Sequence, residues 1–155
     1  MRQPCSVLVF PFRRDADGPL FAVFRRSDDS NWQSVAGGVE GDETLVEAAR
    51  RETAEEAAIT TRHPLYKLDM VSGVAKTWFA ARKYWPDDLY IVEKHFFGMD
   101  VTDEADAIAL SREHDDFRWT TYDNAESMLR YDDDKTALWE LDERIRRGDL
   151  PTALG

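Results

Sequence analysis

The most constraining feature of this sequence is a predicted helix that carries acidic residues together on one face. The stretch from Thr44 to Ala57 has no Pro or Gly and is rich in Ala, Glu, Arg and Leu, which favours helix. Near its end, Glu52 precedes Glu55 by three residues and Glu56 by four, so the three carboxylates share one face. At roughly 5.5 Å each pair repels by about 0.8 kcal/mol in bulk water and by about 3 kcal/mol at an effective dielectric of about 20. A helix packed beside a cleft would therefore need a counter-charge.

A divalent cation is one such counter-charge. Mg²⁺ takes carboxylate oxygens as ligands while it keeps water and substrate phosphate in its coordination shell. The alternative is a solvated helix face held by ion pairs such as Glu47–Arg51, because surface helices are often rich in Glu. The spacing of the acids leaves both interpretations open.

Composition limits the functions that this chain of 155 residues can serve. Its 31 acidic residues outnumber the 20 Lys and Arg, which gives a formal net charge of −11. Such a surface repels duplex nucleic acid and anionic membranes, so we expect neither as a partner. An anionic substrate would need local positive charge, which a divalent metal could supply. The apolar fraction of 43% is enough for one core, and we expect residues 1–155 to form a single domain.

The order of apolar and polar residues predicts a mixture of strands and helices. Strands are expected over residues 5–12, 20–25, 32–35, 65–74, 75–81, 89–101 and 117–120, helices over 44–57, 124–129 and 135–147, and a loop over 36–43. In the last helix Leu138, Leu141 and Ile145 share one face. Because strands and helices do not alternate regularly, we expect an α+β fold with a mixed central sheet flanked by helices. The single cysteine, Cys5, fits a reducing environment, and the expected location is the cytoplasm.

The segment from Gly37 to Ile59 reads GGVEGDETLVEAARRETAEEAAI and resembles the Nudix box, G-x5-E-x7-R-E-U-x-E-E-x-G-U, in which U is aliphatic. The matching fixed positions are Gly37, Glu43, Arg51, Glu52, Glu55, Glu56 and Ile59. Thr53 replaces an aliphatic residue, and Ala58 replaces the glycine that normally ends the helix. Because a left-handed C-terminal residue strongly favours Gly, Ala58 predicts a different helix exit, such as one extra turn. The resemblance implies a Nudix-type α/β/α sandwich with a mixed central sheet.

The resemblance also implies a catalytic set that consists of Arg51, Glu52, Glu55 and Glu56. Glu52 and Glu56 would bind a divalent metal, Mg²⁺ or alternatively Mn²⁺, and Glu55 would be a further ligand or the group that polarises water. The carbonyl of Gly37 would complete the metal site, and Arg51 would orient the glutamates. The implied reaction is hydrolysis of a diphosphate linkage, in which a carboxylate accepts the proton of a metal-activated water.

A narrower resemblance is to the bacterial dihydroneopterin triphosphate pyrophosphatase branch of this family. The run RRSDDSNWQSVAGGVEGDE has the WQSV-type stretch of that branch, and REHDDFRWT has its glutamate–histidine pair before a short strand with Trp. This resemblance implies that Glu113 is a metal ligand from outside the box. His114 is expected on the surface, with orientation of Glu113 as the alternative, and Glu93 is an alternative base.

Arginines near the loop are candidates for phosphate binding, because the planar guanidinium donates two parallel hydrogen bonds. Arg25 and Arg26 end a predicted strand, so only one of them should face a cleft, and we expect Arg25 to do so. The alternative is a surface pair with Asp28 or Asp29. Arg2 is a weaker candidate, because the N-terminus is expected to be disordered.

Glycines and aromatic residues complete the expected substrate site. Gly37 and Gly38 belong to the loop that would face the substrate, and Trp32 borders that loop. A flat ring such as adenine or pterin could stack on Trp32, whereas core packing is the alternative. Other aromatics near the expected cleft are expected to pack in the core: Trp78, Phe79, Tyr84, Trp85, Phe96 and Phe97. The run Asp132–Asp134 is interpreted as a solvated stretch that caps the last helix.

Taken together, the sequence favours a Mg²⁺-dependent hydrolase that cleaves a nucleoside or pterin triphosphate to a monophosphate and pyrophosphate. One alternative is a dinucleoside polyphosphate hydrolase of the same fold, which would release a nucleoside triphosphate and a monophosphate. Another is a non-catalytic module that binds nucleotide, although such modules usually lack the glutamates that are kept here. The expected partner is a small-molecule substrate, and the expected assembly is a monomer or a homodimer.

Overall fold

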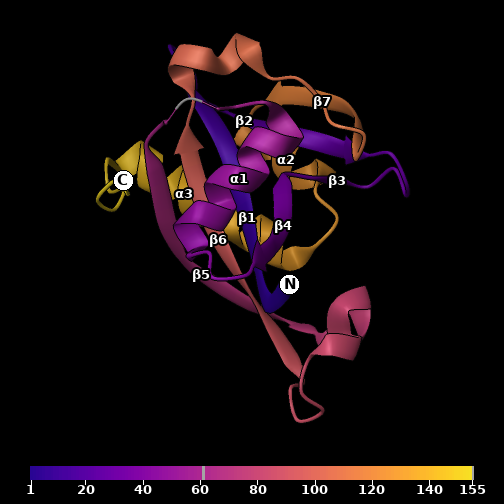
Figure 1. Ribbon diagram of the computed structural model, residues 1–155. Helices are drawn as coiled ribbons and strands as arrows, with labels where there is room; N and C mark the ends of the chain where they lie inside the picture. Colours follow the sequence, from indigo (N-terminus) through magenta and orange to yellow (C-terminus); the bar gives the residue numbers. More distant parts are fainter. Residues whose placement is uncertain (61, 155) are drawn as a thin grey trace.

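The computed structural model describes residues 1–60 and 62–154 of the chain. Within these residues, seven strands form a sheet in the middle layer of the molecule (Figure 1). The strands are β1 (Arg2–Asp15), β2 (Gly18–Arg26), β3 (Trp32–Gln33), β4 (Val35–Glu40), β5 (Leu65–Ala75), β6 (Ile91–Asp100) and β7 (His114–Thr120). β1 pairs in parallel with β6, whereas it pairs antiparallel with β2 and β4. The sheet is therefore mixed, as predicted.

Strand β1 changes partner along its length, and this change positions the site. Its second half pairs with β2, as in Phe12 opposite Phe21, and its first half pairs with β4, as in Val7 opposite Gly37. Because β3 pairs with β2, the chain from β3 to β4 crosses from β2 to β1. Gly37 therefore lies beside the part of β1 that no longer pairs with β2.

Helices cover both faces of the sheet (Figure 1). α1 (Leu45–Ala57) packs in one apolar cluster with Val7 and Val9 of β1, and α2 (Tyr122–Met128) and α3 (Asp132–Arg147) pack in a second cluster with Leu8 and Phe10. Neighbouring residues of β1 therefore point to opposite helical layers and are buried on both sides. The predicted α/β/α sandwich is confirmed.

Local hydrogen bonds close both ends of α1. The Thr44 hydroxyl accepts the Glu47 N–H at 3.1 Å, and the Glu47 carboxylate accepts the Thr44 N–H at 2.8 Å, so Glu47 serves a capping box and not a pair with Arg51. At the other end, Ala58 adopts the left-handed conformation with φ 59° and ψ 25°. The predicted extra turn is therefore wrong, because alanine itself occupies the position that usually needs glycine. The buried Thr53 donates its hydroxyl to the carbonyl four residues earlier at 2.7 Å.

Replacing Ala58 by Gly is expected to stabilise the protein by about 1 kcal/mol. A left-handed conformation costs an L-residue roughly 1–2 kcal/mol, and the greater freedom of Gly in the unfolded chain offsets part of this gain. Ala58 is exposed, so the substitution removes no packing. Urea denaturation measures the effect, with Ala54→Gly inside the helix as the control that should lose about 1 kcal/mol. A destabilised Ala58→Gly protein would rule out strain at this position.

Two predicted segments differ in the structure. Residues 75–81, predicted as a strand, fall largely within two short 3₁₀ helices, η1 (Lys76–Trp78) and η2 (Ala80–Tyr84), in an arm that projects from the sheet (Figure 1). The pairing of β5 with β6 ends at Ala75 opposite Ile91, and beyond it the backbone turns on itself. The predicted loop at 36–43 begins with strand β4, because residues 36–40 pair with β1.

A third 3₁₀ segment, η3 (Thr102–Ala107), follows β6. Across residues 1–60 and 62–154, none of the helices has the length and apolarity that are needed to cross a bilayer.

Candidate active site

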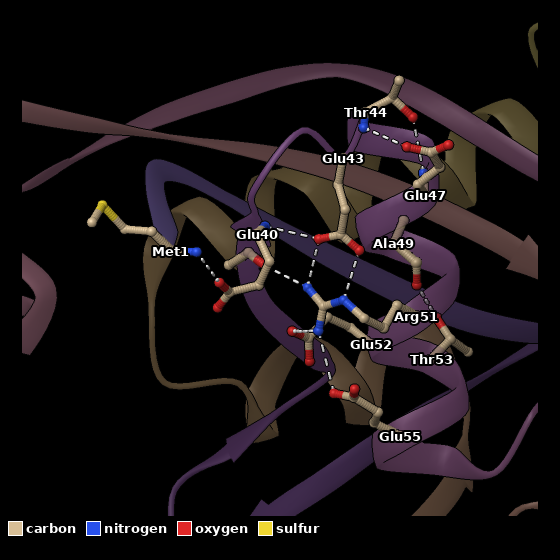
Figure 2. Close-up of polar contacts among 11 residues, drawn as sticks. Met1, Glu40, Glu43, Thr44, Glu47, Ala49, Arg51, Glu52, Thr53 and Glu55 are labelled. Carbon is tan, nitrogen blue, oxygen red and sulfur yellow. Dashed lines mark hydrogen bonds and ion pairs between the residues drawn. The ribbon is translucent and has the colours of Figure 1, made fainter.

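Arg51 on α1 is the centre of the polar contacts that join this helix to the loop before it (Figure 2). Its Nε and Nη2 donate to Glu43 at 2.7 and 2.9 Å, and Nη2 also donates to the Gly38 carbonyl at 2.7 Å. Its Nη1 donates to Glu52 at 2.8 Å and to Glu55 at 3.3 Å. The hydrogen bonds with Glu43 are the main reason that the Arg51 pKa is raised. A cation of the protein therefore neutralises part of the acidic face.

Charged side chains lie directly against the backbone of two adjacent glycines. A Cβ atom at Gly37 would lie 2.0 Å from Cδ of Glu52, and one at Gly38 would lie 1.9 Å from Nε of Arg2. Only glycine permits such an approach. Burial raises the pKa of Glu52, although the hydrogen bond from Arg51 acts against this shift. The two glycines thus place a carboxylate and a guanidinium at neighbouring points of β4.

Glu56 is the buried carboxyl group of the site, with an exposed fraction of 2%. Its Oε2 accepts the Ala36 N–H at 3.0 Å, whereas its Oε1 is buried without a hydrogen-bond partner among the described residues. Burial is the main cause that raises its pKa to about 10, and the neighbouring carboxyl groups of Glu113 and Glu52 add to the shift. Glu113 therefore lies beside Glu56, although the two are far apart in sequence.

The segment that carries Glu113 is tied to β2 and β3. The Glu113 carbonyl accepts the Ser27 N–H at 2.9 Å, which fixes the backbone next to the end of β2. His114 is 4% exposed, lies 5.3 Å from the Phe24 ring, and its Nε2 lies 3.3 Å from Nε2 of Gln33. The expectation of a surface histidine is wrong, because the ring packs between β2 and β3. Gln33 of the WQSV stretch thus helps to hold the loop that carries Glu113.

These residues fit a divalent cation. Among the described residues, no group of three or more His, Cys, Asp or Glu is arranged so that it could hold a metal ion as it stands. The carboxylates of Glu52 and Glu55 instead accept hydrogen bonds from Arg51. However, Glu56 has a buried oxygen without a partner, and Glu113 and Glu52 lie close enough to raise its pKa. Hard oxygen donors with excess negative charge are the set that Mg²⁺ or Mn²⁺ prefers.

Two adjoining cavities, of about 530 and 490 Å³, run along this site and share Arg2, Arg26, Ala36 and Gly37. We call them together the cleft. Its acidic end is lined by Glu40, Glu52 and Glu113, among others. Its aromatic end is lined by Trp78, Phe79 and Tyr131, with Lys94 and Asp133. Because its two ends are lined by different kinds of residue, the cleft offers separate surroundings to a phosphate chain and to a ring.

Of the two arginines at the end of β2, Arg26 lines the cleft, and the expectation from strand alternation that Arg25 does so is corrected. Arg25 turns to the other side of β2, where its Nε donates to Asp115 at 2.7 Å and its guanidinium lies 6.0 Å from the Trp32 ring. Arg26 is paired with Asp28, with Nη2 donating to Oδ2 at 2.6 Å. The surface pair proposed as an alternative therefore forms with Arg26. The pairing of β2 with β7 shifts between these two arginines.

Arg2 was expected to be a weaker candidate for phosphate binding than Arg25, but the structure favours it. It belongs to β1 and not to a disordered terminus, because the strand begins at this residue. Its Nη2 donates to Ser6 Oγ at 2.9 Å, its guanidinium lies 5.2 Å from the Phe79 ring, and its Nε is buried without a partner among the described residues. Burial lowers its pKa from the usual value, although it remains a cation. The sequence signal that could have placed Arg2 in an ordered strand was the β-favouring stretch that follows it.

The aromatic residues divide between core and cleft. Trp85, Phe96 and Phe97 are buried, as predicted, whereas Trp78 and Phe79 line the cleft. The core expectation is also wrong for Tyr84, which is 61% exposed and lines neither cavity of the cleft. Trp32 packs at the edge of the apolar cluster on the α2–α3 face and lies outside the two cavities of the cleft. The core alternative for Trp32 therefore fits the structure better than stacking. Glu93 is likewise not among the residues that line the cleft.

The chain belongs to the NUDIX domain family, which its residues 2–139 match. It is accordingly a Nudix-type pyrophosphohydrolase, a class of enzymes that hydrolyse diphosphate linkages and generally use divalent metals.

Individual relatives refine this assignment. Dihydroneopterin triphosphate diphosphatase of Haemophilus influenzae is 28% identical over 145 residues, which cover 92% of this chain and 89% of that protein. A crystal structure described as a NUDIX hydrolase from Listeria monocytogenes is 35% identical, with a TM-score of 0.86 and coverage of 97% of this chain and 99% of that chain. The Escherichia coli dihydroneopterin triphosphate pyrophosphohydrolase structure has a TM-score of 0.74 at 23% identity and covers 92% and 97%, which shows a shared fold.

Proposed function

We propose that this chain hydrolyses a nucleoside or pterin triphosphate to a monophosphate and pyrophosphate in the presence of Mg²⁺. The observation that carries the proposal is the buried Glu56, which has an unpartnered oxygen and lies beside Glu113 and Glu52, two residues that line the acidic end of the cleft. A buried carboxyl group of this kind is costly to the fold unless it serves a ligand.

The acidic end would hold the metal through Glu52, Glu56 and Glu113, with the Gly37 carbonyl as a further oxygen donor. When bound, Mg²⁺ or Mn²⁺ supplies charge neutralisation at the phosphates and lowers the pKa of a coordinated water. Glu55 is mostly exposed and, next to these residues on α1, could accept the proton of that water. Hydrolysis of the diphosphate linkage would thus use carboxylates in two roles, as metal ligands and as the base.

The middle of the cleft would bind the phosphate chain. Arg2 lines both cavities, and its guanidinium contacts the Ser6 hydroxyl and the Phe79 ring rather than a carboxylate. Arg26 lies on the same stretch but is already paired with Asp28. Arg2 is therefore the cation that is best prepared to receive an anionic ligand.

Arg2→Met is expected to raise KM for the triphosphate about 10- to 100-fold with a smaller effect on kcat, because a charge-assisted hydrogen bond to phosphate is lost. Steady-state kinetics at saturating Mg²⁺ measures both parameters. Arg25→Met is the matched control, because Arg25 lies at the same sheet outside the cleft, and its KM should change less than threefold by comparison. The assignment is wrong if the two variants behave alike, or if Arg25→Met has the larger effect.

A substrate panel tests the reaction itself. Nucleoside triphosphates, dihydroneopterin triphosphate, diphospho-sugars and dinucleoside polyphosphates are incubated with Mg²⁺, and the products are identified by mass. The proposal predicts a monophosphate and pyrophosphate, and the name of the Haemophilus relative supports the pterin member of the panel. Preferential cleavage of a dinucleoside tetraphosphate to a triphosphate and a monophosphate would establish the alternative enzyme. Binding without hydrolysis of any compound would establish a non-catalytic module.

A further inference from the structure

The aromatic end of the cleft contains a charged pair that the hydrolytic chemistry does not use. Lys94 of β6 and Asp133 in the first turn of α3 both line the cavity, together with Trp78 and Tyr131. Their side chains are 15% and 23% exposed, so each still reaches the cavity. The position is separate from the acidic end, where the carboxylates of α1 and Glu113 lie.

Neighbouring residues hold this pair in place. Ser72 Oγ donates to Asp133 Oδ2 at 2.8 Å, and the Asp134 N–H donates to Asp133 Oδ1 at 2.9 Å. Lys94 Nζ donates to Asp134 Oδ1 at 2.6 Å and lies 3.4 Å from Asp133 Oδ2. Asp134 is 1% exposed, so the expectation of a solvated acidic run is wrong at this residue. A fixed carboxylate and a fixed ammonium group thus stand side by side at the cavity wall.

The chemistry of the two groups is complementary. Burial opposes ionisation of Asp133, but the charge of Lys94 and the hydrogen bonds from Ser72 and Asp134 outweigh it, so the Asp133 pKa is lowered. Asp133 is therefore an acceptor only, with a lone pair left on each oxygen. Lys94 has three N–H donors, of which one donates to Asp134; its ammonium group forms an ion pair with Asp133 at 3.4 Å and lies 5.1 Å from the Phe96 ring.

Two aromatic rings line the same cavity and stay largely in solvent. Trp78 is 82% exposed and Tyr131 is 51% exposed. Large aromatic side chains at a cavity wall provide faces on which a planar ring can stack. A flat ligand in this cavity would therefore have its faces against aromatic residues and an edge within reach of charged groups.

We propose that Asp133 and Lys94 determine ring specificity by reading an edge that has an amino group, a ring N–H and a carbonyl in a row. The carboxylate would accept the amino and ring N–H groups in parallel, and the ammonium group would donate to the carbonyl. This edge is found in guanine, as the 2-amino-6-oxo edge, and in pterins, as the 2-amino-4-oxo edge. Adenine places an acceptor nitrogen where the ring N–H is needed, and hypoxanthine lacks the amino group. The inference rests on the proposed function, because it assumes that the ring of a triphosphate substrate enters the aromatic end.

A comparison of kcat/KM between nucleotides that differ at this edge tests the inference. The values of kcat/KM with Mg²⁺ are measured for GTP, ITP and ATP, and we expect GTP to exceed ITP by about 10- to 100-fold and ATP by more. Asp133→Asn keeps the size of the side chain but replaces one acceptor oxygen by a donor amide. In this variant the GTP-to-ITP ratio should fall to near one, while kcat/KM for ITP should change only a few-fold.

The matched control is Asp132→Asn, at the exposed neighbouring position outside the cavity, and it should keep the ratio of the unmodified protein. Thermal melting shows that each variant is folded. Calorimetric binding of GTP and ITP without metal gives a second readout, in which the same preference should appear and should disappear in Asp133→Asn. Equal binding and turnover of the two nucleotides, or a ratio that survives in Asp133→Asn, would overturn the inference. If no triphosphate is hydrolysed, the proposed function fails, and the binding preference alone decides the role of Asp133.

Discussion

Glu56→Gln is expected to reduce kcat by about 10³-fold or more and, at the same time, to make the metal-free protein more stable. The first effect follows because an amide binds a hard cation poorly and accepts no proton. The second follows from the position of Glu56, which is buried next to Glu113 and Glu52. Glu56 therefore lowers the stability of the metal-free protein while it serves the reaction.

The stability gain expected for Glu56→Gln depends on pH, because Glu56 binds a proton more tightly in the folded protein than in the unfolded chain. Burial is the main cause that places the Glu56 pKa at about 10 in the folded protein, well above its ordinary 4.5. The stability associated with this group is thus fully present below pH 4.5 and declines as the pH rises toward the folded pKa, because the folded state must keep a proton that the unfolded state has released. Glutamine needs no such proton, so the advantage of the variant should widen with pH.

Melting temperatures of both proteins in excess chelator, between about pH 5 and pH 9, measure this difference. We expect Glu56→Gln to melt higher by a few degrees at neutral pH, which corresponds to about 1–3 kcal/mol for a chain of this size. Glu126→Gln on α2, away from the cleft, is the control, and neither its activity nor its melting temperature should change appreciably. A fully active Glu56→Gln enzyme would contradict the proposed role, and a less stable one would contradict the electrostatic account.

Arg51→Lys is expected to give the second large effect, a loss of about 2–4 kcal/mol of stability together with a loss of about 100-fold in activity. The guanidinium serves Glu43, the Gly38 carbonyl, Glu52 and Glu55 with three nitrogens in one plane. A single ammonium group cannot reach these positions at once, so polar groups would lose partners and the glutamates would lose their orientation.

Urea denaturation and kinetics on the same samples measure both losses. Arg118→Lys is the control, because Arg118 is exposed, pairs loosely with Asp116 at 3.7 Å and lies 5.3 Å from the Trp32 ring, a contact that a lysine can also make. Its replacement should change stability by less than about 0.5 kcal/mol. If Arg51→Lys were as stable and active as the control, Arg51 would not organise the site.

Residues that act within one local segment could be predicted from the sequence. The spacing of Glu52, Glu55 and Glu56 is a helical property, and the structure places these residues on one helix, as expected. The capping box of Thr44 and Glu47 has the local sequence pattern T-x-x-E, although Glu47 was considered above only as a partner of Arg51. The apolar run over residues 5–12 indicated a buried strand, and the structure buries both Leu8 and Val9 on opposite faces of β1.

Residues whose position depends on distant pairing could not be placed in the same way. Glu113 approaches Glu56 because its segment is held against β2, and this relation followed only from resemblance. Arg2 and Lys94 come together at one cavity because β1 and β6 are neighbours in the sheet, which no local pattern reveals. The left-handed Ala58 was missed because the propensity for glycine is a preference that the surrounding fold can override.

The most direct test of the central claim is a crystal of the protein grown with Mn²⁺ and measured for anomalous scattering. We expect an anomalous peak within coordination distance of carboxylate oxygens of Glu56, Glu52 and Glu113, at the acidic end of the cleft, and no such peak in Glu56→Gln at the same Mn²⁺ concentration. A peak elsewhere, or a peak that persists unchanged in Glu56→Gln, would contradict it.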